Sequence, residues 1–113
     1  MPEYRQWDIV RVRINPEDRD AHPAVIISSD EIAGRAGYVR LNVLYCSTKR
    51  PAKSLASYEV MLNSADGLEA LTKVDCGFLY TIKKDSIINP WGRVSVERRR
   101  AIKQKIVECF GLL

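Results

Sequence analysis

The sequence predicts a mainly β fold in which a small, strongly curved sheet or partial barrel is followed by one C-terminal helix. Two observations support this prediction. Segments in which apolar residues recur with a period of two cover most of the chain, and turn-forming residues separate them. A period of three to four appears only near the C-terminus. Sequential short strands with one terminal helix are typical of small barrel-like domains.

Five strands are predicted, over residues 8–14, 24–28, 38–46, 58–62 and 74–82. Most of them alternate between apolar and polar residues, as half-buried strands do. The exception is the continuous apolar run Ala24-Val25-Ile26-Ile27, which predicts a strand buried on both faces. The remaining segments are predicted to be a loop at 16–23, at most one helical turn at 30–37, a turn at 63–67, a short helical turn at 84–88, a chain break at Pro90-Trp91-Gly92 and an extended piece at 93–94.

The terminal helix is predicted to start after Ser95, a favourable N-cap residue, and to stop at Gly111. Its apolar face is formed by Ile102, Ile106, Cys109, Phe110 and Leu113. Its other face carries Arg98, Arg99, Arg100, Lys103 and Lys105. Positive charge near the N-terminus of a helix opposes the helix dipole, so it is either tolerated or compensated by a bound anion.

With 113 residues, the chain is expected to form a single domain over 1–113. Its apolar runs are much shorter than a membrane helix needs, and the polar N-terminus indicates neither export nor anchoring. The three cysteines (Cys46, Cys76 and Cys109) are an odd number without a Cys-x-x-Cys pair, which argues against a zinc site. All three lie on apolar patterns, so we expect them to be free thiols in the core of a cytoplasmic protein.

The formal net charge is +4, and the basic residues are concentrated in two segments. Residues 31–53 contain five basic side chains and one acidic side chain, and residues 83–105 contain eight basic and two acidic ones. Such segments form either an ordinary solvated surface or a binding surface for a polyanion, to which phosphate contacts supply most of the affinity. Charge alone does not decide between these two interpretations.

Two places carry residue types suited to chemistry. The only histidine, His22, precedes Pro23 at the start of the buried strand. It is either a surface or packing residue or an acid or base that works near neutral pH. Ser47 and Thr48 directly follow the third predicted strand and are themselves followed by two cations, Lys49 and Arg50. These hydroxyls either form a turn or contact a phosphate. The sequence contains no P-loop and no Gly-x-Gly-x-x-Gly motif.

Several segments, taken in order, resemble the MazF/PemK family of bacterial toxins. Trp7-Asp8-Ile9-Val10 is similar to the family's opening Gly-Asp-Ile-Val strand, and His22-Pro23-Ala24-Val25-Ile26-Ile27-Ser28 is similar to its Arg-Pro-Ala-Leu-Val-Val-Ser strand. Cys46-Ser47-Thr48 lies where the family has a threonine after strand three. Tyr58 to Leu62, Tyr80 to Lys84, and the segment from Gly92 through Val94-Ser95 to Gly111-Leu112 follow in the family's order.

The resemblance implies an SH3-like barrel that forms a homodimer and cleaves single-stranded RNA without a metal or other cofactor, under the control of an acidic antitoxin. It implies that the ribose 2′-hydroxyl attacks the neighbouring phosphate while an arginine and a threonine or serine stabilise the phosphate. The matching hydroxyl is Ser47 or, with a shift of one residue, Thr48. Lys49, Arg50 and Lys53 are then expected to bind RNA.

One departure from the family bears on activity, because the family's catalytic arginine is replaced here by His22. His22 is then either the acid that protonates the leaving 5′-oxygen, with Arg19 supplying positive charge, or the sign of an inactive site. The leading hypothesis is a toxin-like endoribonuclease. The alternatives are an RNA- or protein-binding module of the same fold without cleavage, and an unrelated SH3-like interaction domain.

Overall fold

The computed structural model describes residues 4–13, 21–48, 55–68 and 71–112. In chain order, the elements are β1 (Asp8–Val12), β2 (His22–Ile26), α1 (Asp30–Gly34), β3 (Arg40–Ser47), β4 (Glu59–Leu62), η1 (Ser64–Asp66), β5 (Thr72–Asp75), β6 (Tyr80–Lys83), η2 (Lys84–Ser86), β7 (Ile87–Arg93) and α2 (Val96–Phe110), where η denotes a 3-10 helix. No helix in these ranges is long and apolar enough to cross a membrane.

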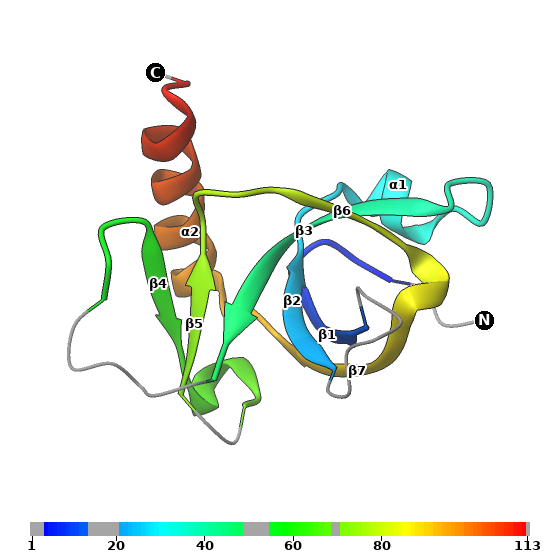
Figure 1. Ribbon diagram of the computed structural model, residues 1–113, viewed down its shortest axis with the longest axis horizontal. Coiled ribbons are helices and arrows are strands. Elements are labelled where there is room, and N and C mark those ends of the chain that lie inside the picture. The colour runs from blue at the N-terminus through cyan, green and yellow to red at the C-terminus, as the bar shows by residue number, and fades with distance from the viewer. Residues whose placement is uncertain (1–3, 14–20, 49–54, 69–70, 113) are drawn as a thin grey trace.

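The strands form one antiparallel sheet in the order β4-β5-β3-β2-β1-β7, and β6 pairs with the N-terminal half of β3. The sheet curls so that β1, β2, β6 and β7 surround one side of the molecule, while α2 lies beside β4 and β5 (Figure 1). Among the described strands, no ladder joins β6 to β7, so the barrel is only partly closed. The predicted fold, a curved β-sheet or partial barrel with a C-terminal helix, is confirmed.

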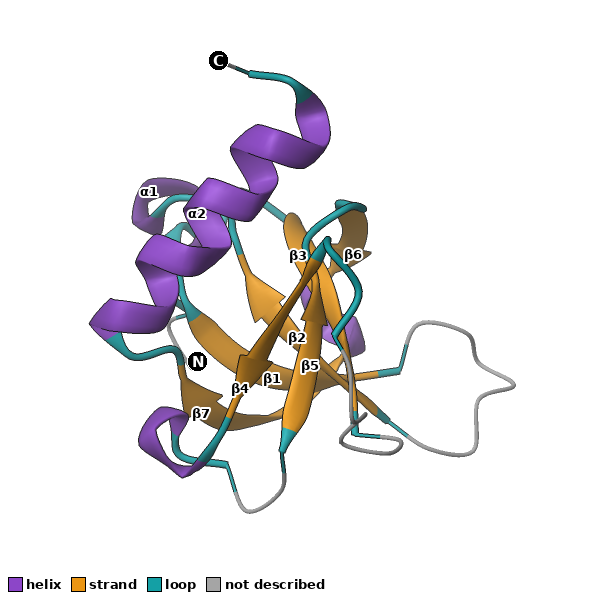
Figure 2. Ribbon diagram, turned by 90° about the vertical axis from the view of Figure 1, so that its left-hand side faces the viewer, coloured by secondary structure: helices purple, strands orange, loops and turns teal. Residues whose placement is uncertain are grey.

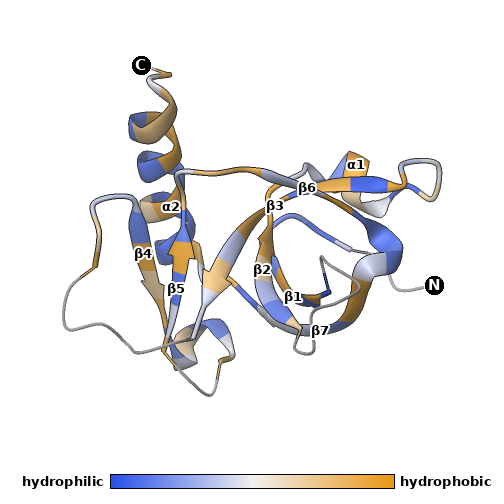
Figure 3. Ribbon diagram, viewed as in Figure 1, coloured by the Kyte–Doolittle hydropathy of each residue, from blue (hydrophilic) through white to orange (hydrophobic). Residues whose placement is uncertain are grey.

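Two apolar clusters fill the two sides of this sheet. One contains Val25 and Leu44 together with residues of β4, β5 and α2, and the other contains Ala24 and Val43 together with residues of β1 and β6. β2 and β3 therefore contribute to both clusters, and Figure 3 shows the apolar colouring along them. The prediction that Ala24 to Ile27 forms a strand buried on both faces is confirmed for Ala24, Val25 and Ile26, each of which is 0% exposed.

Most of the differences from the predicted elements are at their ends. β2 begins at His22, so His22 and Pro23 belong to the strand and not to the predicted loop. β3 begins at Arg40, because Tyr38 and Val39 lie in the exposed connection from α1. The predicted helical turns at 30–37 and 84–88 appear as α1 and η2. The end of the first predicted strand, Ile14, lies outside the described residues.

The predicted strand at 74–82 is wrong, because this segment contains two strands, β5 and β6. The interruption follows Cys76, where the amide of Gly77 donates to the Asp75 carboxylate at 2.8 Å. Both strands pair along the same edge of β3, with Val74 opposite Cys46 and Tyr80 opposite Val43. β5 also pairs with β4. The break lets β5 pair with β4 and with the C-terminal end of β3, and it lets β6 pair with the N-terminal half of β3.

The predicted chain break at Pro90-Trp91-Gly92 is also wrong, because β7 runs through all three residues. β7 is an edge strand that pairs only with β1 among the described strands, and an edge tolerates a proline. The register shifts between Ile9 and Val10, so that Ile9 faces Gly92 and Val10 faces Pro90. The extra residue, Trp91, is accommodated in a bulge.

Gly92 is required because a Cβ atom at this position would lie 2.5 Å from the backbone oxygen of Asp66. We expect Gly92→Ala to lower the free energy of unfolding by about 2–3 kcal/mol, since β7 or η1 must shift to relieve the clash. Gly37→Ala is the matched control, because an added Cβ there meets nothing within 4 Å. Urea unfolding of the two variants measures the difference. A Gly92→Ala protein as stable as Gly37→Ala would contradict this account.

The basic N-terminus of α2 is compensated by an internal anion, Asp66. Its side chain is fully buried, and one carboxylate oxygen accepts a 2.7 Å hydrogen bond from the amide of Ser95, the N-cap residue. The other oxygen accepts from the amide of Asn63 and lies 3.8 Å from Nε of Arg98. Ser95 is the N-cap as predicted, but its side chain makes no capping hydrogen bond. A buried carboxylate from η1 therefore takes over the role of stabilising this helix end.

The last turns of α2 project past the strands, as Figures 1 and 2 show. Ile102 is fully buried against the sheet, whereas Cys109, Phe110 and Leu112 are exposed. The prediction that all three cysteines lie in the core is therefore confirmed for Cys46 and Cys76 and wrong for Cys109. Helical periodicity identifies the apolar face correctly, but the helix is longer than the sheet surface available to cover it. Gly111 terminates the helix in the left-handed conformation, as predicted.

Candidate nucleic-acid interface

His22 is the first residue of β2 and lies opposite Val12 of β1. The following residues of β2 are buried, whereas His22 itself is exposed at the strand end. Its ring is perpendicular to that of Tyr45 on the neighbouring strand β3, with the centroids 6.1 Å apart. The imidazole is therefore held beside an aromatic ring on one side and is open to solvent, a position in which it can exchange protons with a bound molecule.

The two candidate hydroxyls lie at the C-terminal end of β3. Ser47 is the last residue of the strand and pairs with Lys73 of β5, and Thr48 follows directly. Both are exposed. The ammonium group of Lys73 lies 3.7 Å from the carboxylate of Glu59 on β4, so this cation is paired within the sheet. The two exposed hydroxyls are suited to donate hydrogen bonds to an anion.

The register of the sheet relates these two places. The β2–β3 ladder ends with Ala24 opposite Tyr45. Continued by two residues on the same face, this register sets His22 opposite Ser47. Facing positions of antiparallel strands lie about 5 Å apart at Cβ. We therefore expect the imidazole and one of the hydroxyls to lie close enough to contact the same phosphate. This proximity stays a prediction, as do the catalytic roles of the two groups.

The other predicted site residues (Arg19, Lys49, Arg50 and Lys53) lie outside the described residues. Their roles also stay predictions. They belong to the two connections that flank the candidate site in sequence, one preceding His22 and the other following Thr48.

A row of aromatic rings beside His22 was not predicted as part of the site. Tyr45 makes an edge contact with Tyr80 of β6 at a centroid distance of 4.4 Å, and Tyr80 lies 6.4 Å from Phe78. The alternation of residues 74–82 assigned Phe78 and Tyr80 to the buried face of one long strand. Instead, they are 64% and 40% exposed, because the chain is interrupted between β5 and β6. An unusual density of aromatic residues at 78–80 was the available signal.

The buried thiols are unsuited to nucleophilic catalysis. Burial raises the pKa of Cys76 to about 12, with smaller contributions from Cys109 and Asp75, and burial likewise raises the pKa of Cys46. Both groups are therefore neutral thiols at physiological pH, and the thiolate is the reactive form. Within the described residues, no three His, Cys, Asp or Glu side chains lie close enough together to hold a metal ion.

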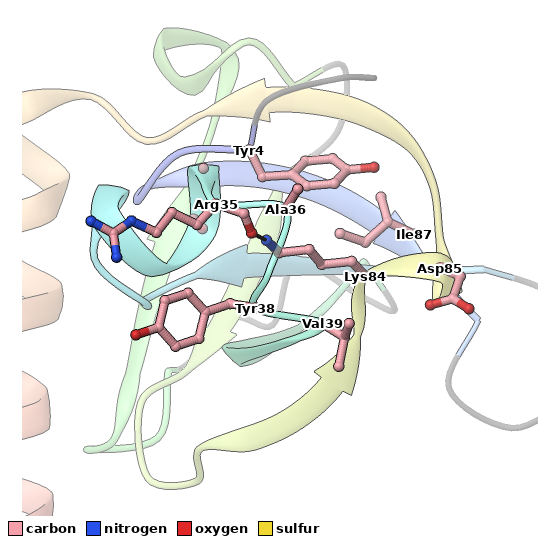
Figure 4. A pocket seen from close by; sticks show the side chains of 10 residues that line it. Tyr4, Arg35, Ala36, Tyr38, Val39, Lys84, Asp85 and Ile87 are labelled. Atoms are coloured by element: carbon pink, nitrogen blue, oxygen red, sulfur yellow. Dashed lines mark hydrogen bonds between the residues drawn. The ribbon is translucent and has the colours of Figure 1, made fainter.

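A separate pocket of about 490 Å³ lies between α1 and η2 (Figure 4). Tyr4, Tyr38, Val39 and Ile87 contribute its apolar lining. Lys84 crosses it and donates hydrogen bonds from Nζ to the backbone oxygens of Ile32 and Arg35, at 3.2 and 2.6 Å. These oxygens belong to the C-terminal end of α1, so Lys84 acts there as a helix cap.

The sequence matches the family described as PemK-like, MazF-like toxin of type II toxin-antitoxin system over residues 5–110. The chain belongs to this toxin family. The match includes β1, β2 and β3, which carry the candidate site, and extends through α2 to Phe110. The resemblance found in the sequence is thereby confirmed. No curated protein matches the chain.

Solved structures of this family share the fold. An endoribonuclease in complex with its cognate antitoxin from mycobacterial species is 16% identical, with a TM-score of 0.77 over 98% of this chain and 96% of that one. The Mycobacterium tuberculosis toxin MazF-mt6 is 18% identical, with a TM-score of 0.75 over 92% and 96%. A MazE-MazF structure from Deinococcus radiodurans is 12% identical, with a TM-score of 0.74 over 97% and 98%. At these identities the comparison concerns the fold.

Proposed function

We propose that this chain is a cytoplasmic endoribonuclease toxin that cleaves single-stranded RNA without a metal ion. The observation that carries the proposal is the match to the PemK-like, MazF-like toxin family over residues 5–110. The β2–β3 register supports it, because its continuation by two residues beyond Ala24 and Tyr45 would set His22 opposite Ser47. The similarity to a mycobacterial endoribonuclease with nearly complete coverage of both chains supports it. RNA is favoured over DNA as the substrate because its 2′-hydroxyl is a nucleophile built into the strand.

In the proposed reaction, the 2′-oxygen of one ribose attacks the adjacent phosphorus and its proton passes to water. The new bond closes a 2′,3′-cyclic phosphate, and the bond from phosphorus to the 5′-oxygen of the next nucleotide breaks. His22 donates a proton to that leaving oxygen. Ser47 or Thr48 donates a hydrogen bond to a phosphate oxygen, while Arg19 supplies positive charge to the pentavalent phosphate. Lys49, Arg50 and Lys53 bind neighbouring phosphates.

We further propose that the chain forms a homodimer and is inhibited by an acidic antitoxin. The exposed apolar side chains at the end of α2, Phe110 and Leu112, support a protein interface, since such surface is normally covered in a complex. Arg100 and Lys103 are exposed on the same helix and suit an acidic partner. The related mycobacterial endoribonuclease was solved with its cognate antitoxin, and the Deinococcus radiodurans relative was solved as MazE-MazF.

A second candidate function is a binding module of the same fold that keeps its partners but does not cleave RNA. The observation that favours it is His22 itself, which stands where the sequence comparison with the family places an arginine. An imidazole stabilises an oxyanion less well than a guanidinium group unless it also transfers a proton. A measurement of RNA cleavage therefore distinguishes the endoribonuclease from the binding module.

The test is incubation of the purified protein with single-stranded RNA of mixed sequence in EDTA. We expect discrete fragments whose downstream pieces carry a 5′-hydroxyl, no cleavage of DNA of the same sequence, and slower cleavage as the salt concentration rises. RNA methylated at every 2′-oxygen is the matched control and should stay intact. Cleavage that stops in EDTA and returns with Mg²⁺ would contradict the metal-free mechanism. Binding without any cleavage would favour the binding module.

A further inference from the structure

The aromatic row beside His22 has three members on the sheet face that carries His22 and Ser47, namely Tyr45, Tyr80 and Phe78. Tyr45 lies opposite Ala24 and Tyr80 lies opposite Val43, so the row crosses from β2 to β6 over β3. The rings follow one another at centroid distances of 6.1, 4.4 and 6.4 Å, starting from His22. The row is therefore continuous from the imidazole outward.

Exposure increases along this row. Tyr45 is half-buried and contacts both His22 and Tyr80, whereas Tyr80 is 40% exposed and Phe78 is 64% exposed. Neither Tyr80 nor Phe78 belongs to the two apolar clusters of the core. Packing within this chain accordingly does not explain why two large rings are placed side by side at the outer end of the row.

The position of the row favours a nucleic acid as its ligand, because the row begins at His22 in the candidate site. The cations Arg13 and Lys83 line a hollow that also contains the acidic residue Asp85. Lys83 alternates with Tyr80 along β6 and so points to the other face of the sheet, which means that the rings themselves make the contact. Proteins bind single-stranded nucleic acid on such exposed aromatic rings, since bases stack on them irrespective of sequence.

We propose that Phe78 and Tyr80 form a stacking platform for the bases of single-stranded RNA next to the phosphate held at His22. This inference rests on the proposed function and adds the substrate contact that positions the strand. Tyr45 acts as a positioning residue, because its ring supports Tyr80 through the edge contact and separates it from the imidazole. Stacking requires no hydrogen bond to a base edge, so the platform tolerates any sequence.

The test measures binding of a fully 2′-O-methylated single-stranded RNA of about 10 nucleotides, which the protein binds without cleaving it. Fluorescence anisotropy should show that Phe78→Ala and Tyr80→Ala each raise Kd about 10-fold, because each removes a stacking surface. Phe78→Tyr and Tyr80→Phe keep a ring and should bind like the wild type. Tyr38→Ala, which removes a ring of 44% exposure outside the row, is the matched control and should leave Kd unchanged.

A second ligand, with the same backbone but abasic at its central positions, isolates the stacking contribution. The platform predicts that Tyr80→Ala and the wild type bind this ligand equally. Equal Kd values for Tyr80→Ala, Phe78→Ala and the control variant Tyr38→Ala on the intact RNA would overturn the platform while leaving the cleavage test untouched. The aromatic row could instead be covered by a second copy of the chain, and sedimentation of the same variants tests this alternative. If the wild type is a dimer and Tyr80→Ala is a monomer, the row forms a contact between protein copies and the proposal is overturned.

Discussion

Replacing His22 with alanine is expected to slow RNA cleavage by about 100-fold, because the leaving 5′-oxygen then departs without a positioned acid. RNA binding should be almost unchanged, since the imidazole is one small group beside a row of larger rings. The measurement is single-turnover cleavage of labelled RNA, combined with anisotropy for affinity. Thermal unfolding should be unaffected as well, because His22 is exposed at a strand end.

Two further variants define what His22 does. His22→Arg introduces the family's residue and should cleave faster than His22→Ala, because a guanidinium group neutralises charge on the phosphate. Gln104→Ala changes an exposed residue of α2 whose side chain donates a hydrogen bond to Glu108 of the same helix, and it should cleave at the wild-type rate. If His22→Ala cleaves as fast as Gln104→Ala, the imidazole is not the acid, and Ser47, Thr48 and the arginines must account for the reaction.

The parts of the fold that were predicted correctly are those in which burial follows directly from residue pattern. Ala24 to Ile26 is a continuous apolar run with both faces buried, and Ile102 lies at the centre of a helical apolar stripe that ends at Gly111. In each case, tertiary packing agrees with local preference, so the pattern is sufficient. The family match over residues 5–110 includes both of these segments.

The errors arose where the partner of a segment, rather than its own pattern, decides its conformation. Residues 74–82 alternate between apolar and polar throughout, yet they form parts of two strands, because two different strands pair with one edge of β3. Pro90 reads as a breaker, yet it is tolerated at a sheet edge with a bulge. Cys109 continues the helical stripe, yet the sheet beneath it has ended. The residues of a segment do not by themselves predict which strand or surface that segment will pack against.

The candidate site shows the same division. His22 and Ser47 are candidates because of their residue types and their positions at strand ends, and the β2–β3 register would set them opposite each other if it continued two residues beyond Ala24 and Tyr45. The aromatic row could not be selected in this way, because alternation assigns Phe78 and Tyr80 to a core face. Only the break after Cys76 places them on the surface beside the imidazole. The sequence thus predicts a chemistry for the candidate site, which stays a prediction, whereas the sheet topology shows the aromatic surface beside it.

Trp7 presents a conflict between backbone and side chain. Its φ is 77°, the only positive value at a non-glycine position among the described residues, and it occupies the place of a glycine in the family's opening motif. The conformation is imposed from both sides, because its amide donates to the oxygen of Ile26 at 2.8 Å and its oxygen accepts from the amide of Val94 at 2.9 Å. The indole is 7% exposed in the core, and Nζ of Lys103 lies 5.9 Å from the ring centroid.

Trp7→Ala is expected to lower the free energy of unfolding by about 3–5 kcal/mol, because it removes the buried indole and keeps a Cβ in the left-handed region. Trp7→Gly loses the same indole without that strain, so it should be about 1 kcal/mol more stable than Trp7→Ala. Ile9 provides the control pair: it is fully buried in a strand, and there alanine should be the more stable replacement. Urea unfolding of the four variants compares the two orders. If alanine is the more stable replacement at both positions, the left-handed backbone conformation at Trp7 carries no strain. Burial of the indole then does not have to compensate for an unfavourable backbone conformation.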